Sequence, residues 1–385
     1  MDGNTREIVI VLVSPEASGF DGLMRRTRVW LVGVCCGVAV LSGCTSGSKP
    51  APPSSSHPTS SSPVPSSTPP APAPKPKPKP KPQARRVEPL TGLPVRVVPQ
   101  RPVLIVKVEN SPQARPQTAL NQADLVFEEL VEGGITRFAA MFHSSIPPRV
   151  GPVRSLRDVD REITGPTHGV LVASGAAGVV RRRVARGAAQ VVLPTNAGRY
   201  FSRSGRPAPH NLYLFPRGLL HVARGVHRKP PGTTYLPFAT TVAGSTAVRY
   251  GQRTSWISLG FSPAANPRWR YDGRSKTWLR SEGSTPSRLT SGQRITARTI
   301  LVVRIHTRDA GYRDPAGNFV PRTVFTGQGN AQVFCEGRRI SALWIKKSPR
   351  SPLRLVTRSG HKPVLIAPGR TWIEMVPVSG SLRAG

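Results

Sequence analysis

Long apolar runs separated by loops rich in glycine and proline characterise the first folded half of the chain. Residues 103–108 form a β-branched apolar run, which predicts a buried strand, and residues 169–173 predict another. The short glycine-containing segment 174–178 comes next, and a helix is predicted over 179–190. Strands that alternate with helices indicate a mixed α/β domain, which we place at residues 87–234.

The apolar pattern changes at about residue 235 to short alternating stretches with turn residues between them. This pattern predicts a second, mostly β domain over residues 235–385. Asp272-Gly273 and Glu336-Gly337 are typical of hairpin turns. The whole chain is therefore expected to have an α+β fold. The predicted strands of this half are 247–250, 255–259, 269–271, 295–306, 323–326, 331–334, 340–346, 353–356 and 372–376.

The first 86 residues indicate export and tethering. Met24 opens a positively charged segment, an apolar run follows, and Cys44 closes a Leu-Ser-Gly-Cys processing site, as in bacterial lipoprotein signal peptides. We predict a mis-assigned start over 1–23, a signal peptide over 24–43 and lipidation of Cys44. An uncleaved membrane helix is the alternative, but it would need ~20 apolar residues. A Pro/Ser/Lys-rich disordered linker is predicted over 44–86.

The basic charge of the chain extends into its folded part. The formal charge is +36, and residues 85–385 alone hold 46 Lys/Arg against 15 Asp/Glu. Such a surface attracts polyanions: nucleic acid, anionic lipid or an anionic wall polymer. The arginine bias of a GC-rich genome would give the same excess. Export argues against a nucleic-acid partner, and 6% aromatic residues offer few stacking platforms.

Cysteine and histidine usage indicates neither a metal centre nor a cofactor. Besides Cys44, the mature chain would keep one cysteine, Cys335, so no intrachain disulfide is possible. An apolar strand surrounds Cys335, which favours a packing role over a nucleophilic one. The histidines are scattered without metal-ligand spacing, and the chain carries no serine-hydrolase motif.

Carboxylates gather beside arginines in residues 128–162. The stretch around Gly133-Gly134 could be helix or strand, and the double glycine favours a two-residue hairpin. The register of that hairpin has Glu128 opposite Ala139. One face of the hairpin then carries the charged groups, and the other carries mostly apolar ones.

Two acidic side chains of this hairpin are candidates for acid–base chemistry. Glu132 is expected on the charged face with Arg137. Glu129 is expected on the apolar face, where burial is costly without a paired cation and should raise the pKa. If the stretch is helical instead, this argument about Glu129 fails.

Three loops stiffened by proline or glycine carry further polar side chains: 109–117, 151–157 and 206–213. The second is predicted to lead into a helix that starts near Ser155. Function concentrates on loops held by a rigid scaffold, so their side chains are site candidates. The full candidate set has Arg115, Arg137, Arg154, Arg157 and Asn211 as ligand-binding residues and Glu129, Glu132 and His210 as catalytic residues.

The chain carries short motifs at 88–94, 114–117, 132–138, 151–155, 208–211, 327–329, 344–346 and 369–373. Their order resembles the YerB-like lipoproteins, a bacterial two-domain family of unknown function. The resemblance covers about residues 88–378 and implies an N-terminal and a C-terminal domain but no reaction. Ser174-Gly175 departs from the Gly-Gly-Ser-like turn more common in that family. That departure weakens the phosphate-binding interpretation of 174–178, for which a plain strand-to-helix turn is the alternative.

Two functions fit these observations. The first is a surface-tethered binding or scaffolding module that holds an anionic envelope component, such as a phosphate- or carboxylate-bearing wall polymer. The second is an envelope hydrolase or transferase in which Glu129 or Glu132 works with His210. Both place the protein at the cell membrane, anchored through Cys44 and facing the extracytoplasmic side. The sequence sets no oligomeric state.

Overall fold

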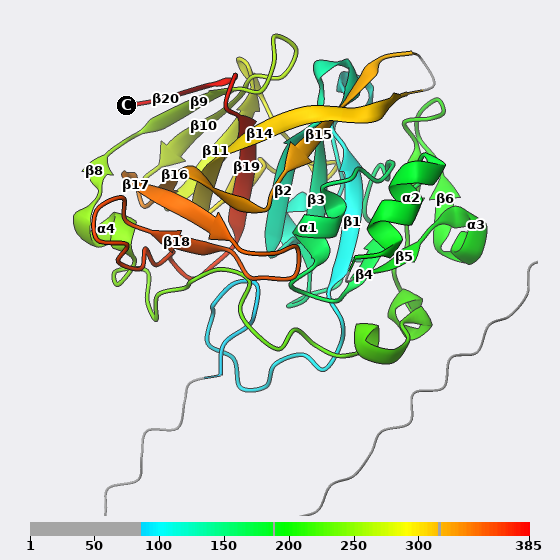
Figure 1. Cartoon of the computed structure of the whole chain (residues 1–385), viewed down its shortest axis with the longest axis horizontal. Coiled ribbons are helices and arrows are strands. Elements are labelled where there is room, and N and C mark those ends of the chain that lie inside the picture. Colours follow the sequence, from blue (N-terminus) through cyan, green and yellow to red (C-terminus); the bar gives the residue numbers. More distant parts are fainter. Residues whose placement is uncertain (1–85, 188, 315–316) are drawn as a thin grey trace, which may run out of the picture. The chain divides into compact units, whose positions relative to one another are not determined.

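A 12-stranded mixed sheet organises the described part of the chain, which the computed structural model gives as residues 86–187, 189–314 and 317–385 (Figure 1). The signal peptide, the lipidated Cys44 and the linker predicted from the sequence lie outside these residues. The strand order is β18-β17-β16-β14-β19-β2-β3-β1-β4-β5, with β15 on β14 and β8 on β17. The strands are β1 (Leu104–Glu109), β2 (Leu125–Leu130), β3 (Thr136–Phe142), β4 (Val170–Val172), β5 (Gln190–Val192), β8 (Gln252–Arg253), β14 (Thr299–Arg313), β15 (Phe319–Val324), β16 (Gly327–Cys335), β17 (Arg338–Lys346), β18 (Arg354–Val356) and β19 (Thr371–Pro377).

Strands from both halves of the sequence share this sheet. The C-terminal strand β19 pairs in parallel with β2, from Thr371 opposite Leu125 to Met375 opposite Glu129. The sequence boundary near residue 235 therefore does not separate two sheets, and the described residues form one compact unit. Main-chain hydrogen bonds thus join the predicted segments 87–234 and 235–385.

The described part of the chain has few and short helices. They are α1 (Asp160–Thr164), α2 (Gly178–Ala185), α3 (Pro194–Ala197) and α4 (Thr246–Tyr250). The first half is thus less helical than the predicted α/β pattern. Helix α4 replaces the strand predicted over 247–250, and Ser245 and Gly251 stand at its ends, where these residue types are favoured. No helix of the described ranges is long and apolar enough to cross a membrane.

A second sheet packs on one face of the main sheet. Its strands are β9 (Trp256–Gly260), β10 (Pro267–Asp272), β11 (Thr277–Glu282), β12 (Thr285–Pro286), β13 (Thr296–Ala297) and β20 (Ser381–Ala384). The interface is aromatic: the Trp269 and Trp372 rings lie 5.2 Å apart, and those of Trp278 and Phe334 lie 5.9 Å apart. The opposite face of the main sheet is covered by α1, α2 and loops, where Phe127 meets Tyr235 at 5.5 Å. Strands β6 (Phe201–Arg203) and β7 (Leu212–Leu214) form a separate pair.

The β2–β3 hairpin is confirmed, but its predicted register is wrong by one residue. Glu128 lies opposite Phe138, and Glu129 lies opposite Arg137. The loop is longer than the two-residue turn, because Val131 N donates to Ile135 O and both glycines adopt positive φ inside it. This longer loop also buries Val131, which a two-residue turn would have left in the strand ladder.

Two helix predictions also need correction. Residues 151–156 are extended beside β1, since Arg154 N donates to Lys107 O, so α1 begins at Asp160 rather than near Ser155. Helix α2 ends at Ala185, earlier than the predicted 190, and the edge strand β5 takes the last part of that segment. The two-residue hairpin at Glu336-Gly337 is confirmed by pairing of Cys335 with Arg338.

Candidate functional site

The face of the main sheet beneath α1 changes from apolar to charged at the carboxyl end of β1. Alternation places Lys107 and Glu109 of β1 on this face, and the ladders put Arg137 of β3 and Glu129 of β2 beside them. On the same face, the residues farther along these strands, such as Ile105, Phe127 and Met141, belong to the hydrophobic core. The charged ends, together with the loops that follow β1 and β4, form the candidate site.

Lys107 is the centre of a buried ion cluster in this site. Its Nζ lies 2.5 Å from Glu129 Oε1 and 2.7 Å from Asp160 Oδ1, and all three side chains are at most 1% exposed. Burial raises the pKa of Glu129, while the Lys107 charge opposes the rise. Glu129 is therefore buried with a raised pKa, as predicted, and its partner Lys107 was not predicted. A catalytic role for Glu129 is disfavoured, because a fully buried carboxylate held by a lysine cannot meet a ligand.

Three of the five predicted ligand-binding residues line one cavity of about 640 Å³, here called the arginine pocket. They are Arg137, Arg154 and Arg157. Ala176 and Ala177 also line it, and they precede α2, so the positive end of that eight-residue helix lies at the cavity wall. The remaining lining residues are Glu132, Ser155, Tyr312, Arg313, Asp314 and Val320.

Glu132 neutralises part of the positive charge of the arginine pocket. It accepts hydrogen bonds from Arg137 at 3.0 Å and from Arg157 Nε at 2.8 Å, and Arg157 donates a second one. Burial alone would raise the pKa of Glu132, but the Arg157 hydrogen bond and the two guanidinium charges lower it to about 2. Glu132 is therefore ionised at neutral pH, which excludes it as a proton donor there.

Arg154 is the arginine of this pocket with the least engaged guanidinium group. Its Nε lies 3.3 Å from Glu109 Oε1, and its side chain is 25% exposed. Its two terminal nitrogens have no hydrogen-bond partner among the described residues. Arg154 can therefore donate to a ligand, whereas Arg137 and Arg157 donate mainly to Glu132 and to main-chain oxygens.

His210 meets a carboxylate that the sequence argument did not select. Its Nδ1 lies 2.8 Å from Glu109 Oε1, which also accepts a 2.8 Å hydrogen bond from Ser111 Oγ. Glu129 and Glu132, the carboxylates that we predicted to work with His210, have Lys107, Arg137 and Arg157 as their close partners instead. The carboxylate accepts from Nδ1–H, so Nε2 is the basic nitrogen of a ring that is 23% exposed.

The two other predicted ligand-binding residues hold loops in place. Arg115 donates to Asn110 O at 2.7 Å and approaches Glu282 Oε1 at 3.3 Å. Asn211 donates to Arg206 O at 2.7 Å and accepts from Arg203 at 2.8 Å. All three predicted loops contain a cis X–Pro bond, at Pro116, Pro152 and Pro209. The loops do come together, and among the described residues Arg154 has both terminal nitrogens without a hydrogen-bond partner, more than Arg115 has.

A second buried cluster supplies the cation that pairs with Glu128. Arg280 of β11 reaches across from the smaller sheet and donates to both Glu128 oxygens at 2.8 and 2.9 Å. Glu374 accepts from Trp269 Nε1 at 2.6 Å, and burial followed by the Glu128 charge raises the pKa of Glu374 well above its usual range. This cluster joins the two sheets and lies apart from the arginine pocket's lining.

The residues that sequence reasoning missed are Lys107, Glu109, Ser111 and Asp160. Glu109 carried a usable signal, because it is the polar residue that directly ends a predicted buried strand. Its contact with His210 joins positions 101 residues apart, so it depends on how two distant loops pack.

The chain is similar to known proteins over most of its described part. Residues 90–228 match "Protein of unknown function (DUF3048) N-terminal domain", and residues 257–373 match "Protein of unknown function (DUF3048) C-terminal domain". The chain is 30% identical over 300 residues to "Putative lipoprotein YerB" of Bacillus subtilis (strain 168), which covers 75% of this chain and 86% of that protein. The crystal structure of YerB protein from Bacillus subtilis aligns with a TM-score of 0.64 and 26% identity, over 78% of this chain and 100% of that one.

Proposed function

The chain belongs to the YerB-like family of proteins of unknown function (DUF3048), and we propose that it is a lipid-anchored binding protein of the cell envelope. Its ligand is an anionic envelope component, such as a phosphate- or carboxylate-bearing wall polymer, held in the arginine pocket. The similarity to a protein named as a lipoprotein supports an anchor on Cys44. The linker over 44–86 then carries the folded unit on the extracytoplasmic side of the membrane.

The observation that carries this proposal is that the two terminal nitrogens of Arg154 have no partner among the described residues and lie in a cavity with an excess of arginines. The lining contains four arginines and two acidic residues. Glu132 engages two of the arginines, and the terminal nitrogens of Arg154 remain available. A planar guanidinium group donates two parallel hydrogen bonds to phosphate or carboxylate, so Arg154 suits either acid.

Sedimentation of the full-length lipoprotein with isolated cell walls tests the proposal. At low ionic strength we expect retention, and added salt should weaken it steeply because the attraction is between exposed charges. Arg154→Ala should weaken retention by about tenfold, the worth of one charged hydrogen bond. Arg186→Ala, which removes an exposed arginine after α2, is the matched control and should retain wild-type binding. Absence of retention at low salt would refute the proposal.

A second candidate function, an envelope hydrolase or transferase, is favoured by the His210–Glu109 pair alone. Buried Glu109 orients the ring, and Nε2 of His210 could accept a proton from water or from a hydroxyl group. Mass spectrometry of material released from isolated walls separates the two functions. An enzyme releases fragments, and His210→Gln abolishes the release, whereas a binding protein is retained and releases nothing.

A further inference from the structure

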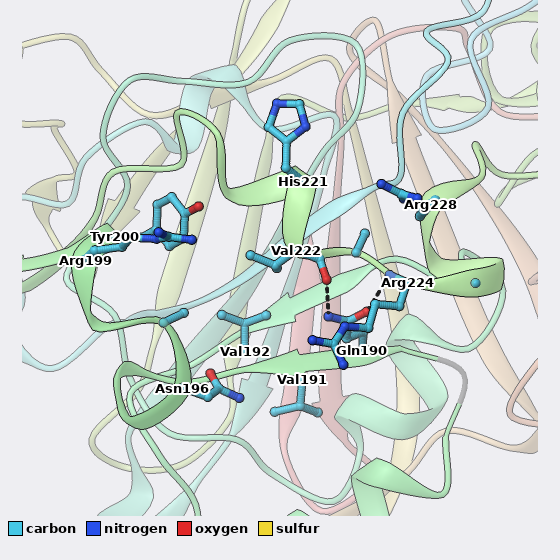
Figure 2. Close-up of a pocket in the computed structure, with 13 residues that line it drawn as sticks. Gln190, Val191, Val192, Asn196, Arg199, Tyr200, His221, Val222, Arg224 and Arg228 are labelled. Carbon is cyan, nitrogen blue, oxygen red and sulfur yellow. Dashed lines mark hydrogen bonds between the residues drawn. The ribbon is translucent and has the colours of Figure 1, made fainter.

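A second cavity, of about 1050 Å³, lies along the edge strand β5 (Figure 2). We call it the β5 pocket. Val191 and Val192 of the strand line it, together with residues from α3 and from three short 3-10 helices. These are η4 (Gly198–Tyr200), η5 (Leu219–Val222) and η6 (Gly225–Arg228). None of its lining residues lines the arginine pocket, so it is a separate site.

The wall of the β5 pocket is fixed to the edge of the sheet. Gln190 Nε2 donates to Val222 O at 2.8 Å, and Arg224 N donates to Gln190 Oε1 at 2.9 Å (Figure 2). This amide bridges the end of β5 to the segment between η5 and η6. On the other side, Asn196 Oδ1 accepts from Leu193 N at 2.8 Å, which orients its amide, and Nδ2 has no partner among the described residues.

The charge of the β5 pocket is of one sign. Arg199, Arg224, Arg228 and His221 line it, and no acidic residue does. None of these three arginine side chains has a carboxylate partner in the part of the chain that the structure describes. Guanidinium groups around one cavity repel one another, and an acidic ligand removes that cost. The arginine pocket differs, since Glu132 already neutralises part of its charge.

The other groups of the β5 pocket fit a ligand that is more than a bare anion. The Tyr200 ring lies beside Arg199, whose Cζ is 5.1 Å from the ring centroid. The ring offers an apolar surface, Val192 adds a smaller one, and the Asn196 amide can donate to a hydroxyl group. An aromatic face, a hydroxyl-binding amide and acid-binding arginines together match the chemistry of a sugar that carries an acid group.

We propose that the β5 pocket binds an acidic saccharide, a short glycan that bears phosphate or carboxylate. The cavity, at about 1050 Å³, is as large as the largest typical small-molecule sites, which measure about 300–1,000 Å³, so it has room for a short glycan. Arg224 and Arg228 bind the acid group, and Tyr200 packs against a sugar ring. This site goes beyond the proposed function, as it uses other residues and does not depend on Arg154.

Calorimetric titration of the full-length lipoprotein in detergent micelles tests the proposal with matched probes. One pair is a uronic-acid trisaccharide and its carboxyl-reduced form; the other is a trisaccharide phosphomonoester and its dephosphorylated form. At least one acidic probe should bind about tenfold or more tightly than its neutral partner, since a charged hydrogen bond is lost. The pair with the larger ratio identifies the acid group as phosphate or carboxylate.

Variants assign the binding to this pocket. Arg224→Ala and Arg228→Ala should each weaken the acidic probe by about tenfold, whereas Arg186→Ala leaves it unchanged. Tyr200→Ala should weaken the acidic trisaccharide but not inorganic pyrophosphate, which has no ring to pack. Thermal unfolding of each variant confirms that it is folded. In Arg154→Ala, which should weaken wall retention, adding Arg224→Ala should still weaken the acidic probe by about tenfold, and this separates the site from the arginine pocket.

Three results would overturn the proposal. The first is equal affinity for acidic and neutral probes, and the second is the absence of binding by any of the four trisaccharides. The third is a Tyr200→Ala variant that binds the acidic trisaccharide as tightly as the wild type does, which would make the β5 pocket a simple anion site.

Discussion

The Lys107 cluster and the β5 pocket use charged side chains in opposite ways. Lys107 is fully buried, and it meets Glu129 and Asp160 at 2.5 and 2.7 Å. Arg224 and Arg228 are exposed at the rim of a cavity and have no acidic partner among its lining residues. The first cluster is complete within the chain, whereas the second is completed only by something outside it.

This difference separates structural charges from ligand-binding charges in a chain with a large excess of arginine. Burial makes an unpaired charge costly, so a buried charge that persists is paired by the protein itself. An exposed charge costs little without a partner, and its pairing is left to solvent or to a ligand. Arg154 lies between the two groups, with one partner in Glu109 and free terminal nitrogens.

The largest expected effect comes from breaking the complete cluster. Lys107→Met leaves Glu129 and Asp160 buried without their cation, which should lower the free energy of unfolding by about 3–5 kcal/mol. Urea denaturation at pH 7 measures this change. Lys276→Met, at an exposed turn position, is the control and should change stability by less than about 0.5 kcal/mol. A loss below about 1 kcal/mol for Lys107→Met would contradict the assignment of a structural charge.

Glu162 and Lys346 test a third arrangement, burial without a close ion pair. Burial raises the pKa of Glu162 from 4.5 to about 7, and burial lowers the pKa of Lys346 from 10.5 to about 7. A raised carboxyl pKa contributes stability that is present below pH 4.5 and lost as the pH rises through 7. A lowered lysine pKa contributes stability that is present above pH 10.5 and lost as the pH falls through 7. The two contributions together have their minimum near pH 7.

Glu162→Gln isolates the acidic limb of this dependence, because glutamine imitates the protonated carboxyl group. The free energy of unfolding of the wild type, relative to the variant, should fall by about 3 kcal/mol between pH 4.5 and 7.5. Urea denaturation of both proteins at the two pH values gives the difference, in which other titrating groups cancel. A constant difference would show that Glu162 is ionised throughout and finds a cation.

Glu132→Gln should leave Arg137 and Arg157 of the arginine pocket without their internal carboxylate partner. The pKa of Glu132 is lowered to about 2, so its contribution is present above pH 4.5 and is lost only as the pH falls through 2. At pH 7 the substitution should cost about 1–2 kcal/mol of stability. The same substitution frees Arg137 and Arg157, so retention on cell walls should increase. Unchanged stability together with reduced retention would contradict the description of Glu132 as an internal counter-ion.

The local pattern of apolar residues predicted many of the strands well, because a strand that buries one or both faces needs apolar residues at alternate or successive positions. Strand β1 was predicted from 103–108, and β19 was predicted from 372–376. The register of the β2–β3 hairpin was not predictable from the glycines, since Gly133-Gly134 fits both a two-residue turn and a longer loop. Strand β5 was missed because three residues are too few to show a period, and its identity depends on parallel pairing with β4.

The candidate site was predicted as a set of loops and not as a set of contacts. Proline and glycine marked the loops correctly, and Arg154, Arg157 and Arg137 do meet in one cavity. Which carboxylate meets His210 depends on the packing of loops 101 residues apart, where each acidic residue is an equal candidate in sequence. The β5 pocket has no motif, since residues 196–200 and 219–228 come together through the fold alone.

The smallest expected effect comes from the β5 pocket, where a null result on stability is informative. Arg224→Ala and Arg228→Ala should each change the free energy of unfolding by no more than about 0.5 kcal/mol, because no internal partner is lost and like-charge repulsion falls. Arg183→Ala is the matched comparison: Arg183 pairs with Asp158 at 3.2 Å, and its loss should cost about 0.5–1 kcal/mol. Urea denaturation of the three variants at low salt makes the measurement. If Arg224→Ala or Arg228→Ala costs more than Arg183→Ala, that arginine has a structural partner, and its charge is not reserved for a ligand.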